Sequence, residues 1–490
     1  MSRDLRSSSA FRASLLLASA CLAPSGILAE PVEQILSQAQ ADYEDHAIQV
    51  AGIVSPEQML ARAGHALAAP PPQAAAPSAE FDLIDLRFIL IEMARATGTN
   101  DQLSVLRAQP QGRLKALSIQ KGDADLSTVI KTATDMGFYG ADGLTIPLVI
   151  QAGARLTIAD TLMLDRASGA FLINFGRMEV IGGSIIGAGT ENANIPEFRP
   201  FFTTLGTGSF DVRGAVIQSL GFGSAPAFSG FAAIEAGLYR PEDVSSIQDT
   251  LLRDVMSTQF DGLQSPKIVG SIFDHSSGNA LELRQTQNAQ VSQNLFINSG
   301  GDALRITHGS VGTHVNDIEI YEAGLNGIRV NISSHATRLN DVTIWNAAKI
   351  GLSVDRSDCA TISHVSVLFP GQKGVSLRRT RATQLTDSSV LGSRNAGLFV
   401  AEQPDGTVLT LARNRIAGNR VGISTAAPAE IHLDANDFSQ QFPRFLKGDL
   451  SGSIATLTAN LTGSAPLVLQ AGGTDPDLVP PITCTQAEES

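Results

Sequence analysis

One short hydrophobic pattern returns about every two dozen residues between residues 278 and 426. Each copy starts with Gly or Ala, followed by an aliphatic residue, any residue and a second aliphatic residue. In the last copy Thr occupies the second aliphatic position. The copies are almost evenly spaced along the chain. They are Ala280–Leu283, Ala303–Ile306, Gly327–Val330, Gly351–Val354, Gly374–Leu377, Gly397–Val400 and Gly422–Thr425. Alternation with period 2 predicts a β-strand in each copy, and the regular spacing predicts strands that stack as a solenoid.

A second apolar position recurs in step with this pattern and predicts a second strand in each coil. Its members are Val291, Val315, Leu339, Ile362, Leu385 and Leu409. Asn and Asp residues lie near the bends, where they tolerate left-handed backbone. We therefore predict an all-β fold, a right-handed parallel β-helix of the pectate-lyase-like solenoid type with a helical N-terminal region.

Residues 1–29 have the pattern of an export signal. Arg3, Arg6 and Arg12 flank or precede an apolar run at residues 13–20, and small residues precede Glu30. This predicts a periplasmic or secreted mature protein. Cys21 follows small residues but lacks the large aliphatic residue three positions earlier, so lipidation is the less favoured alternative.

The rest of the chain divides by composition into five further parts. They are a helical segment at 30–66, an Ala/Pro-rich linker at 67–80, a capping region at 81–143, the β-helix at 144–450 and a loosely packed C-terminal tail at 451–490. Residues 81–96 and 127–136 have the apolar pattern of helices. Either segment could cover the open N-terminal end of the solenoid, which needs a cap. No stretch after the signal reaches the ~20 apolar residues of a membrane span. Cys359 and Cys484 could pair, but nothing in the sequence decides it.

The charge limits the choice of partner. A formal net charge of −13 argues against a general nucleic-acid binder, which needs a basic surface. A local basic strip could still hold an anionic polymer, because charges beyond ~10 Å are largely screened.

Four segments ahead of the coils resemble one family. They are Leu148–Leu156, Gly169–Asn174, Glu197–Phe201 and Ser219–Phe222, and the Phe-Arg-Pro-Phe run at 198–201 is the most specific. In this order they resemble periplasmic mannuronan C5-epimerases of alginate synthesis, over residues 144 to 442. The resemblance implies conversion of mannuronate to guluronate in an exported polymer, protection of that polymer, and an exopolysaccharide secretion complex as partner.

The chain departs from that family at the catalytic motif. The family carries Asp-Pro-His-Asp after a repeat Gly, with the His as a catalytic acid or base, and this tetrapeptide is absent here. The matching positions hold Glu282, Leu283, Arg284 and Gln285, and His308 stands on the next coil, where the family is expected to place Arg. Either His and Arg have changed places, or the site has decayed.

The repeat also predicts which residues face outward. The residue between the two aliphatics and the residue after them point away from the core. One predicted column is Glu282, Arg305, Arg329, Ser353 and Ser376, and its neighbour is Arg284, Thr307, Asn331, Asp355 and Arg378. Coils stack at ~4.8 Å, so these columns form a polar ladder that suits a linear polysaccharide, with His308, Arg356 and Arg379 at its border.

C5-epimerisation of a uronate needs a cation on the carboxylate, a base and a proton donor on opposite faces of the sugar. We assign His308 as candidate base and Glu282 or Asp355 as its partner. Arg284, Arg305 and Arg329 are candidate carboxylate clamps, since Arg does not deprotonate. The candidate substrate-binding residues are Arg305, Arg329, Asn331, Asp355, Arg356, Arg378 and Arg199. No metal and no organic cofactor are expected.

Several alternatives stay open. The same groups perform β-elimination if the 4-linked sugar leaves, which would make the protein a lyase. For each Arg, an equally weighted alternative to substrate binding is a place in an exposed ion-pair ladder that contributes little energy. A non-catalytic protein that binds or guards an exopolysaccharide is the strongest rival, and a surface adhesin is a third hypothesis.

Overall fold

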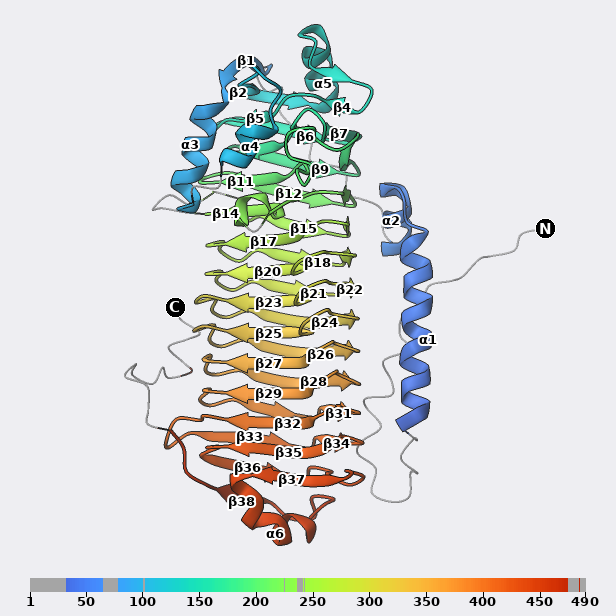
Figure 1. Cartoon of the computed structure of the whole chain (residues 1–490), viewed down its shortest axis with the longest axis vertical. Helices are drawn as coiled ribbons and strands as arrows, with labels where there is room; N and C mark the ends of the chain where they lie inside the picture. Colours follow the sequence, from blue (N-terminus) through green and yellow to red (C-terminus); the bar gives the residue numbers. More distant parts are fainter. Residues whose placement is uncertain are drawn as a thin grey trace, which may run out of the picture.

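The computed structural model describes residues 32–64, 78–99, 102–223, 225–235, 241, 243–474 and 484. The predicted right-handed parallel β-helix is confirmed, as a solenoid of about 12 turns (Figure 1). The predicted signal at 1–29 and most of the linker at 67–80 lie outside the described residues.

One face of the solenoid, here called the ladder sheet, contains the repeated pattern. Each of its strands pairs in parallel with the next one along the stack. Its members are β5 (Leu148–Ile150), β8 (Leu172–Asn174), β11 (Phe202–Leu205), β14 (Gly230–Ile234), β17 (Ser257–Asp261), β20 (Leu281–Arg284), β23 (Leu304–Thr307), β25 (Ile328–Asn331), β27 (Ile350–Asp355), β29 (Lys373–Arg378), β32 (Ala396–Ala401), β35 (Val421–Ala426) and β37 (Arg444–Gly448).

Two further strand positions complete most coils. The first comprises β6 (Ala154–Ile158), β9 (Arg177–Ile181), β12 (Ser209–Arg213), β15 (Ser246–Gln248), β18 (Lys267–Val269), β21 (Gln290–Ser292), β30 (Gln384–Thr386), β33 (Val408–Ala412) and β36 (Glu430–Asp434). The second comprises β7 (Thr161–Asp165), β10 (Ser184–Ala188), β13 (Val216–Gln218), β16 (Leu251–Arg253), β19 (Ile272–Asp274), β22 (Leu295–Ile297), β31 (Ser389–Leu391) and β34 (Arg415–Ala417). In the middle of the stack the two positions merge into β24 (His314–Tyr321), β26 (Arg338–Trp345) and β28 (Thr361–Leu368).

The small residue that begins each copy of the pattern has a steric cause. A Cβ at Gly351 would lie 2.1 Å from Cγ1 of Val367, and a Cβ at Gly374 would lie 2.1 Å from Cγ1 of Val390. The ladder sheet therefore approaches the inner side of the neighbouring sheet most closely at this point. Leu352 and the other aliphatics of the pattern are fully buried in the continuous core that runs along the solenoid axis.

Buried amides satisfy the backbone at the bends between coils. Asn414 accepts a hydrogen bond from the Ser388 N–H at 3.0 Å and donates to the Leu385 carbonyl at 2.8 Å. It also donates to Oδ1 of Asn436, one coil further along, at 2.9 Å. At this bend the amide side chain therefore serves both as a donor and as an acceptor.

A strand and three helices lie at the N-terminal end of the solenoid. β1 (Glu80–Asp85) pairs antiparallel with β2 (Lys115–Asp125), and β2 pairs in parallel with β5 and β6. The coil stack thus begins at β2, ahead of the predicted start at residue 144. Residues 81–96 were expected to be helical throughout, but residues 81–85 lie in β1, and α3 (Leu86–Thr97) begins after the Asp85 N-cap. α4 (Leu103–Ala108) follows, and α5 (Leu126–Asp135) packs Val129 and Ala133 into the core.

The first two helices lie along the side of the solenoid (Figure 1). They are α1 (Val32–Ala51) and α2 (Pro56–Ala63), and they cover an apolar strip that includes Trp345, whose ring centroid lies 5.3 Å from that of Tyr43. Arg253 donates from Nη1 to the Ile53 carbonyl at 2.8 Å just beyond α1. No helix in the described part of the chain has both the length and the apolar character that crossing a membrane requires.

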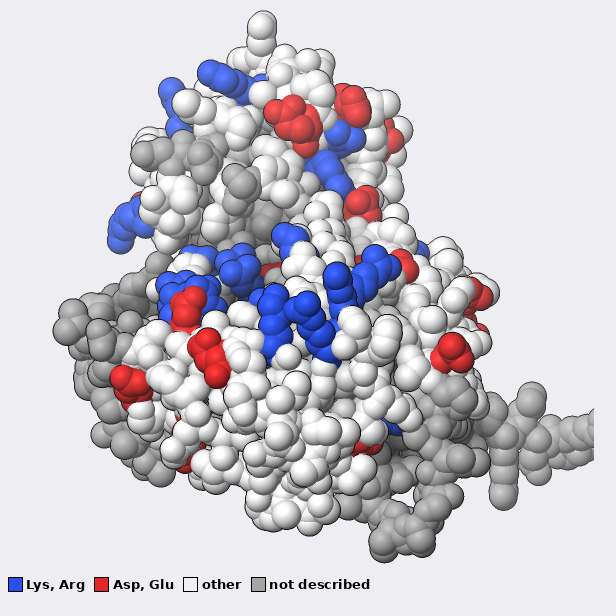
Figure 2. Space-filling model, turned by 60° about the horizontal axis from the view of Figure 1, so that its bottom comes forward, with Lys and Arg blue, Asp and Glu red and all other residues white. Residues whose placement is uncertain are grey.

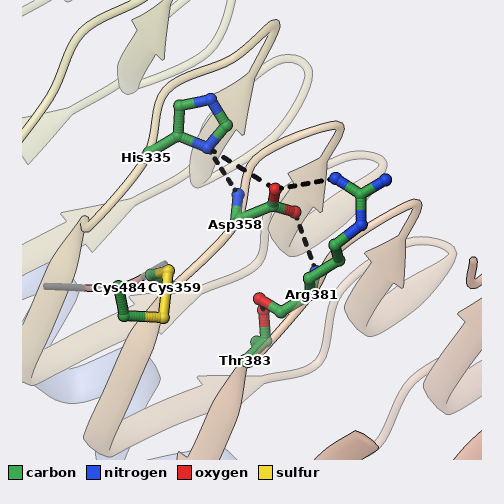
Figure 3. Close-up of a disulfide and its surroundings, with 6 residues drawn as sticks. All are labelled: His335, Asp358, Cys359, Arg381, Thr383 and Cys484. Atoms are coloured by element: carbon green, nitrogen blue, oxygen red, sulfur yellow. Dashed lines mark hydrogen bonds and ion pairs between the residues drawn. A yellow bond between two sulfur atoms is a disulfide. The ribbon is translucent and has the colours of Figure 1, made fainter. Parts of the chain in front are cut away.

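The C-terminal region packs against the last coils, so the prediction of a loose tail is wrong for residues 451–470. η5 (Asp449–Ser453) and α6 (Ile454–Thr458) bury Leu457, and β38 (Leu467–Gln470) pairs antiparallel with β36. Cys484 forms a disulfide with Cys359, a pairing that the sequence left open (Figure 3).

The coil beside the disulfide is held by a stack of side chains (Figure 3). The Asp358 N–H donates to Nδ1 of His335 at 3.0 Å, and the Asp358 carboxylate accepts from the Arg381 N–H at 2.9 Å and from its Nη1 at 3.2 Å. These contacts join three successive coils and fix the turn that contains Cys359.

We expect Asn414→Ala to lower the free energy of unfolding by about 2–4 kcal/mol, because it leaves a buried N–H and a buried carbonyl without partners. The neighbouring Arg413→Ala removes only an exposed ion pair with Asp387, and should cost below ~1 kcal/mol. Urea unfolding followed by circular dichroism measures both; equal losses would contradict a specific role for the buried amide.

Candidate functional site

The outer surface of the ladder sheet is apolar and covered over its first coils. Val149 and Ile173 point outward from β5 and β8 into a cluster with α3 and α4. Four aromatic rings from the irregular segments after β10 and β13 belong to this cluster, which we call the phenylalanine wall: Phe198, Phe201, Phe222 and Phe228. The last of these lies in η4 (Pro226–Phe228).

Beyond the wall the outer surface becomes polar and follows the predicted register. The central column reads Gln259, Glu282, Arg305, Arg329, Ser353, Ser376 and Phe399 from coil to coil. The second column contains Asp261, Arg284, Thr307, Asn331, Asp355 and Arg378. Both predicted columns are therefore present, and Figure 2 shows a band of Lys and Arg side chains on one face of the molecule.

At the N-terminal end of the polar ladder, carboxylates and guanidinium groups pair closely. Arg284 lies 3.2 Å from Asp261 and 3.4 Å from Glu282, while Arg305 lies 3.9 Å from the other oxygen of Glu282. Asn279 donates from Nδ2 to Glu282 at 2.8 Å. Burial raises the pKa of the Asp261 carboxyl, although Arg284 opposes the shift.

His308 stands at the border of this group. It follows β23 in left-handed backbone, with φ of 55°, and its Nδ1 lies 3.0 Å from the Thr307 hydroxyl. Burial lowers the pKa of His308, and the positive charges of Arg284 and Arg305 lower it further. The ring is therefore largely neutral at pH 7 and can accept a proton. The structure thus brings together the predicted catalytic residues His308, Glu282 and Arg284.

Asp302 lies at the opposite edge of the sheet from His308 and was not predicted. It is 1% exposed, and its Oδ1 accepts hydrogen bonds from the Asn326 side chain at 2.7 Å and backbone at 3.1 Å. Burial raises the pKa of this carboxyl, while Asn326, Arg329 and Arg305 act in the opposite direction.

Further along the ladder the cations and carboxylates form a looser network. Asp355 lies 3.6 Å from Arg356 and 3.2 Å from Arg379, and Glu402 lies 2.5 Å from Arg378. All three arginines thus have carboxylate partners supplied by the protein itself.

Two cations of the ladder form no ion pair with a carboxylate among the described residues. The Arg329 side chain makes no ion pair or hydrogen bond with any residue in the described ranges. Lys373 places Nζ 3.3 Å from the ring centroid of Phe399. Burial and the nearby Arg378 lower the pKa of Lys373.

Two predicted substrate-binding residues are less suitably placed. Arg199 donates to the side chain of Asp254 at 2.8 Å, beside the phenylalanine wall and outside the ladder columns. Asn331 occupies its predicted position but is 1% exposed, so it is covered by its neighbours. Within the described residues, no three His, Cys, Asp or Glu side chains converge as a metal-binding group.

Two ladder residues, Asp261 and Lys373, were not predicted as site residues, because the repeat pattern does not clearly mark their positions. Asp261 occupies the outward position one coil before Arg284, but the preceding residues Ser257–Phe260 have neither the Gly or Ala nor the two aliphatics of the pattern. Lys373 directly precedes the repeat residue Gly374, and only its reach toward Phe399 shows that it belongs to the ladder.

Comparison with known proteins supports the fold. The family model described as the right handed beta helix region matches residues 259–414. The crystal structure of the periplasmic alginate epimerase AlgG is similar, with a TM-score of 0.61 and 13% identity over 77% of this chain and 94% of that one. A mutant of AlgG gives a TM-score of 0.59 at 12% identity, over 77% of this chain and 95% of that one. The Azotobacter vinelandii mannuronan C-5 epimerase AlgE4 A-module reaches only 0.38 at 11% identity, over 65% and 89%. A sequence search of curated proteins finds no significant match.

We expect the pKa of His308 to respond in opposite directions to two substitutions. Arg305→Gln should raise it toward the ordinary value of 6.5, because a repelling positive charge is removed, and Glu282→Gln should lower it further. Titration of the His308 ring protons by NMR, assigned with His308→Ala, measures both. If neither variant moves the midpoint, the ring is not electrostatically coupled to this group.

Proposed function

We propose that the protein binds an anionic, uronate-containing polysaccharide along the ladder and abstracts the C5 proton of one sugar with His308. The observation that carries the proposal is a histidine with a lowered pKa beside two arginines, at the edge of a continuous polar column. The fold shared with AlgG is compatible with such a polymer site.

Each residue of the group has a chemical role in this proposal. Neutral His308 accepts the C5 proton, which is made more acidic when Arg305 and Arg284 neutralise the sugar carboxylate. Glu282, on the floor of the ladder, is the proposed acid–base partner of His308, and the proton that returns to the other face of the sugar comes from solvent. Return of the proton gives the epimer, whereas loss of the 4-linked sugar after the same first step gives a lyase product.

One observation favours a non-catalytic binding protein as the second candidate. Glu282 lies within 4 Å of both Arg284 and Arg305, so the charge of these arginines is already partly neutralised. A substrate carboxylate must compete with Glu282 for them. The polymer would then be held without reaction, as in a protein that guards an exopolysaccharide during export.

The proposed cellular location rests on the N-terminal sequence pattern. The signal-like residues 1–29 suggest export to the periplasm, where an exopolysaccharide secretion complex would be the source of the polymer. A mature protein recovered from the periplasmic fraction would support this part of the proposal.

The reaction can be tested by incubating the mature protein with uronate polymers in deuterated water, starting with polymannuronate. We expect deuterium at C5, read by proton NMR. An unsaturated end-group signal instead would identify a lyase. No exchange in any polymer that the protein binds would favour the binding function and contradict proton abstraction.

We expect His308→Ala to lower turnover by about 10²–10⁴-fold while polymer affinity changes less than about threefold, because the base contributes to proton transfer rather than to charge. For the same reason wild-type activity should fall as the pH drops through the lowered pKa of His308. His364→Ala is the control, since His364 is on another sheet and bonds Asn340. Parallel loss of affinity and turnover in His308→Ala would indicate a binding role.

A further inference from the structure

The ladder is accessible from one direction only. In the central column, Gln259 and Glu282 are each 7% exposed, and Ala232 before them is fully buried. Arg305 is the first member of this column with a substantially exposed side chain, at 26%. In the second column the side chains of Asp261 and Arg284 are 21% and 26% exposed, so the accessible surface begins about two coils before His308. The proposed base therefore lies near its N-terminal end.

The obstruction on the N-terminal side is a packed structure. The ring of Phe228 lies 5.0 Å from that of Phe201 and 5.5 Å from that of Phe222. Thr203 donates to the Ala227 carbonyl at 2.5 Å, which ties the wall to β11. Figure 1 shows α3 and α4 at this end of the solenoid, level with the first coils. A polymer on the ladder therefore cannot continue over β11 without displacing buried aromatic rings.

The opposite direction is open. From Arg305 the column continues through Arg329, Ser353 and Ser376 to Phe399, four coil steps of ~4.8 Å or about 19 Å in all. Ser353 has a small, partly exposed side chain, so a sugar ring can approach the backbone there, whereas Ser376 is 5% exposed and is covered by its neighbours. Phe399 ends this part of the column, and Nζ of Lys373 lies over its ring.

The distribution of ion pairs also favours binding of an anion on the open side of the ladder. Arg284 and Arg305, next to the wall, have carboxylate partners within 4 Å. Arg329 makes no ion pair among the described residues, and Lys373 contacts the ring of Phe399. These two cations, both on the open side, are the ones that an anionic ligand can neutralise without displacing a protein carboxylate.

We propose that the ladder binds the end of an anionic polysaccharide chain. One terminus abuts the phenylalanine wall, and the chain runs over Arg329 and the two serines toward Lys373 and Phe399. This places a terminal or near-terminal sugar beside His308, so that modification starts at chain ends. The inference rests on the proposed function only in that an anionic polysaccharide must bind this face.

The test compares one uronate polymer before and after partial depolymerisation to fragments that are still much longer than the open part of the ladder. Binding to the immobilised mature protein is measured by competition and expressed per uronate unit. End binding predicts that a tenfold increase in chain ends lowers the half-inhibitory concentration about tenfold. Unchanged values per uronate unit would show internal binding and overturn the proposal.

A second measurement uses fragments with a bulky group coupled to one terminus or the other. End binding predicts that one of the two blocked fragments loses at least tenfold in affinity. If both bind as well as the unblocked fragment, the proposal is wrong although the polymer-binding function stands. Absence of binding by every polymer would overturn the proposed function as well.

The direction of the chain is tested by substitution on the open side. We expect Lys373→Gln and Phe399→Leu each to weaken fragment binding about fivefold. Lys267→Gln removes an exposed charge from β18, on another sheet, and should leave binding unchanged. If Lys373→Gln binds like Lys267→Gln, the chain does not run toward Phe399.

Discussion

The structure depends on the strict register between successive coils. Parallel strands exchange hydrogen bonds with the coil before and the coil after, so every residue has a fixed neighbour about 4.8 Å away along the axis. The buried aliphatics form one continuous core, and the Gly or Ala of the pattern allows two sheets to approach each other. The same register forces outward side chains into columns, and the polar ladder is a direct result.

Stacking also concentrates charge. Arg305 and Arg329 are neighbours in one column, and two like charges at such a separation repel unless counter-charges or water screen them. Near the phenylalanine wall the protein supplies those counter-charges through Asp261 and Glu282. Arg329 and Lys373 make no such pairs within the described residues. The ladder therefore contains two internally neutralised groups, one near the wall and one around Asp355 and Glu402, and two cations, Arg329 and Lys373, that an anion can approach.

The irregular segments determine what this surface can do. A solenoid alone would present its outer face along the whole stack. Here the insert before β11 and the segment around η4 bring phenylalanine rings over the first coils, and α3 and α4 pack against them. The same packing that covers apolar outward residues such as Val149 and Ile173 also sets the N-terminal limit of the polar ladder.

Local periodicity was enough to predict the fold and the columns, because in a stacked coil the contact partner is always one repeat away. The sequence by itself thus determined the parallel β-helix and the outward positions of Glu282, Arg284, Arg305 and Arg329, and it singled out His308. Contacts without a period could not be predicted in this way. Only the tertiary structure decided the pairing of Cys359 with Cys484, the place of α1 against Trp345, the separation of Arg199 from the ladder, the buried Asp302 and the reach of Lys373 to Phe399. Each of these depends on how segments far apart in the chain fold back onto the solenoid, and no repeating pattern encodes that path.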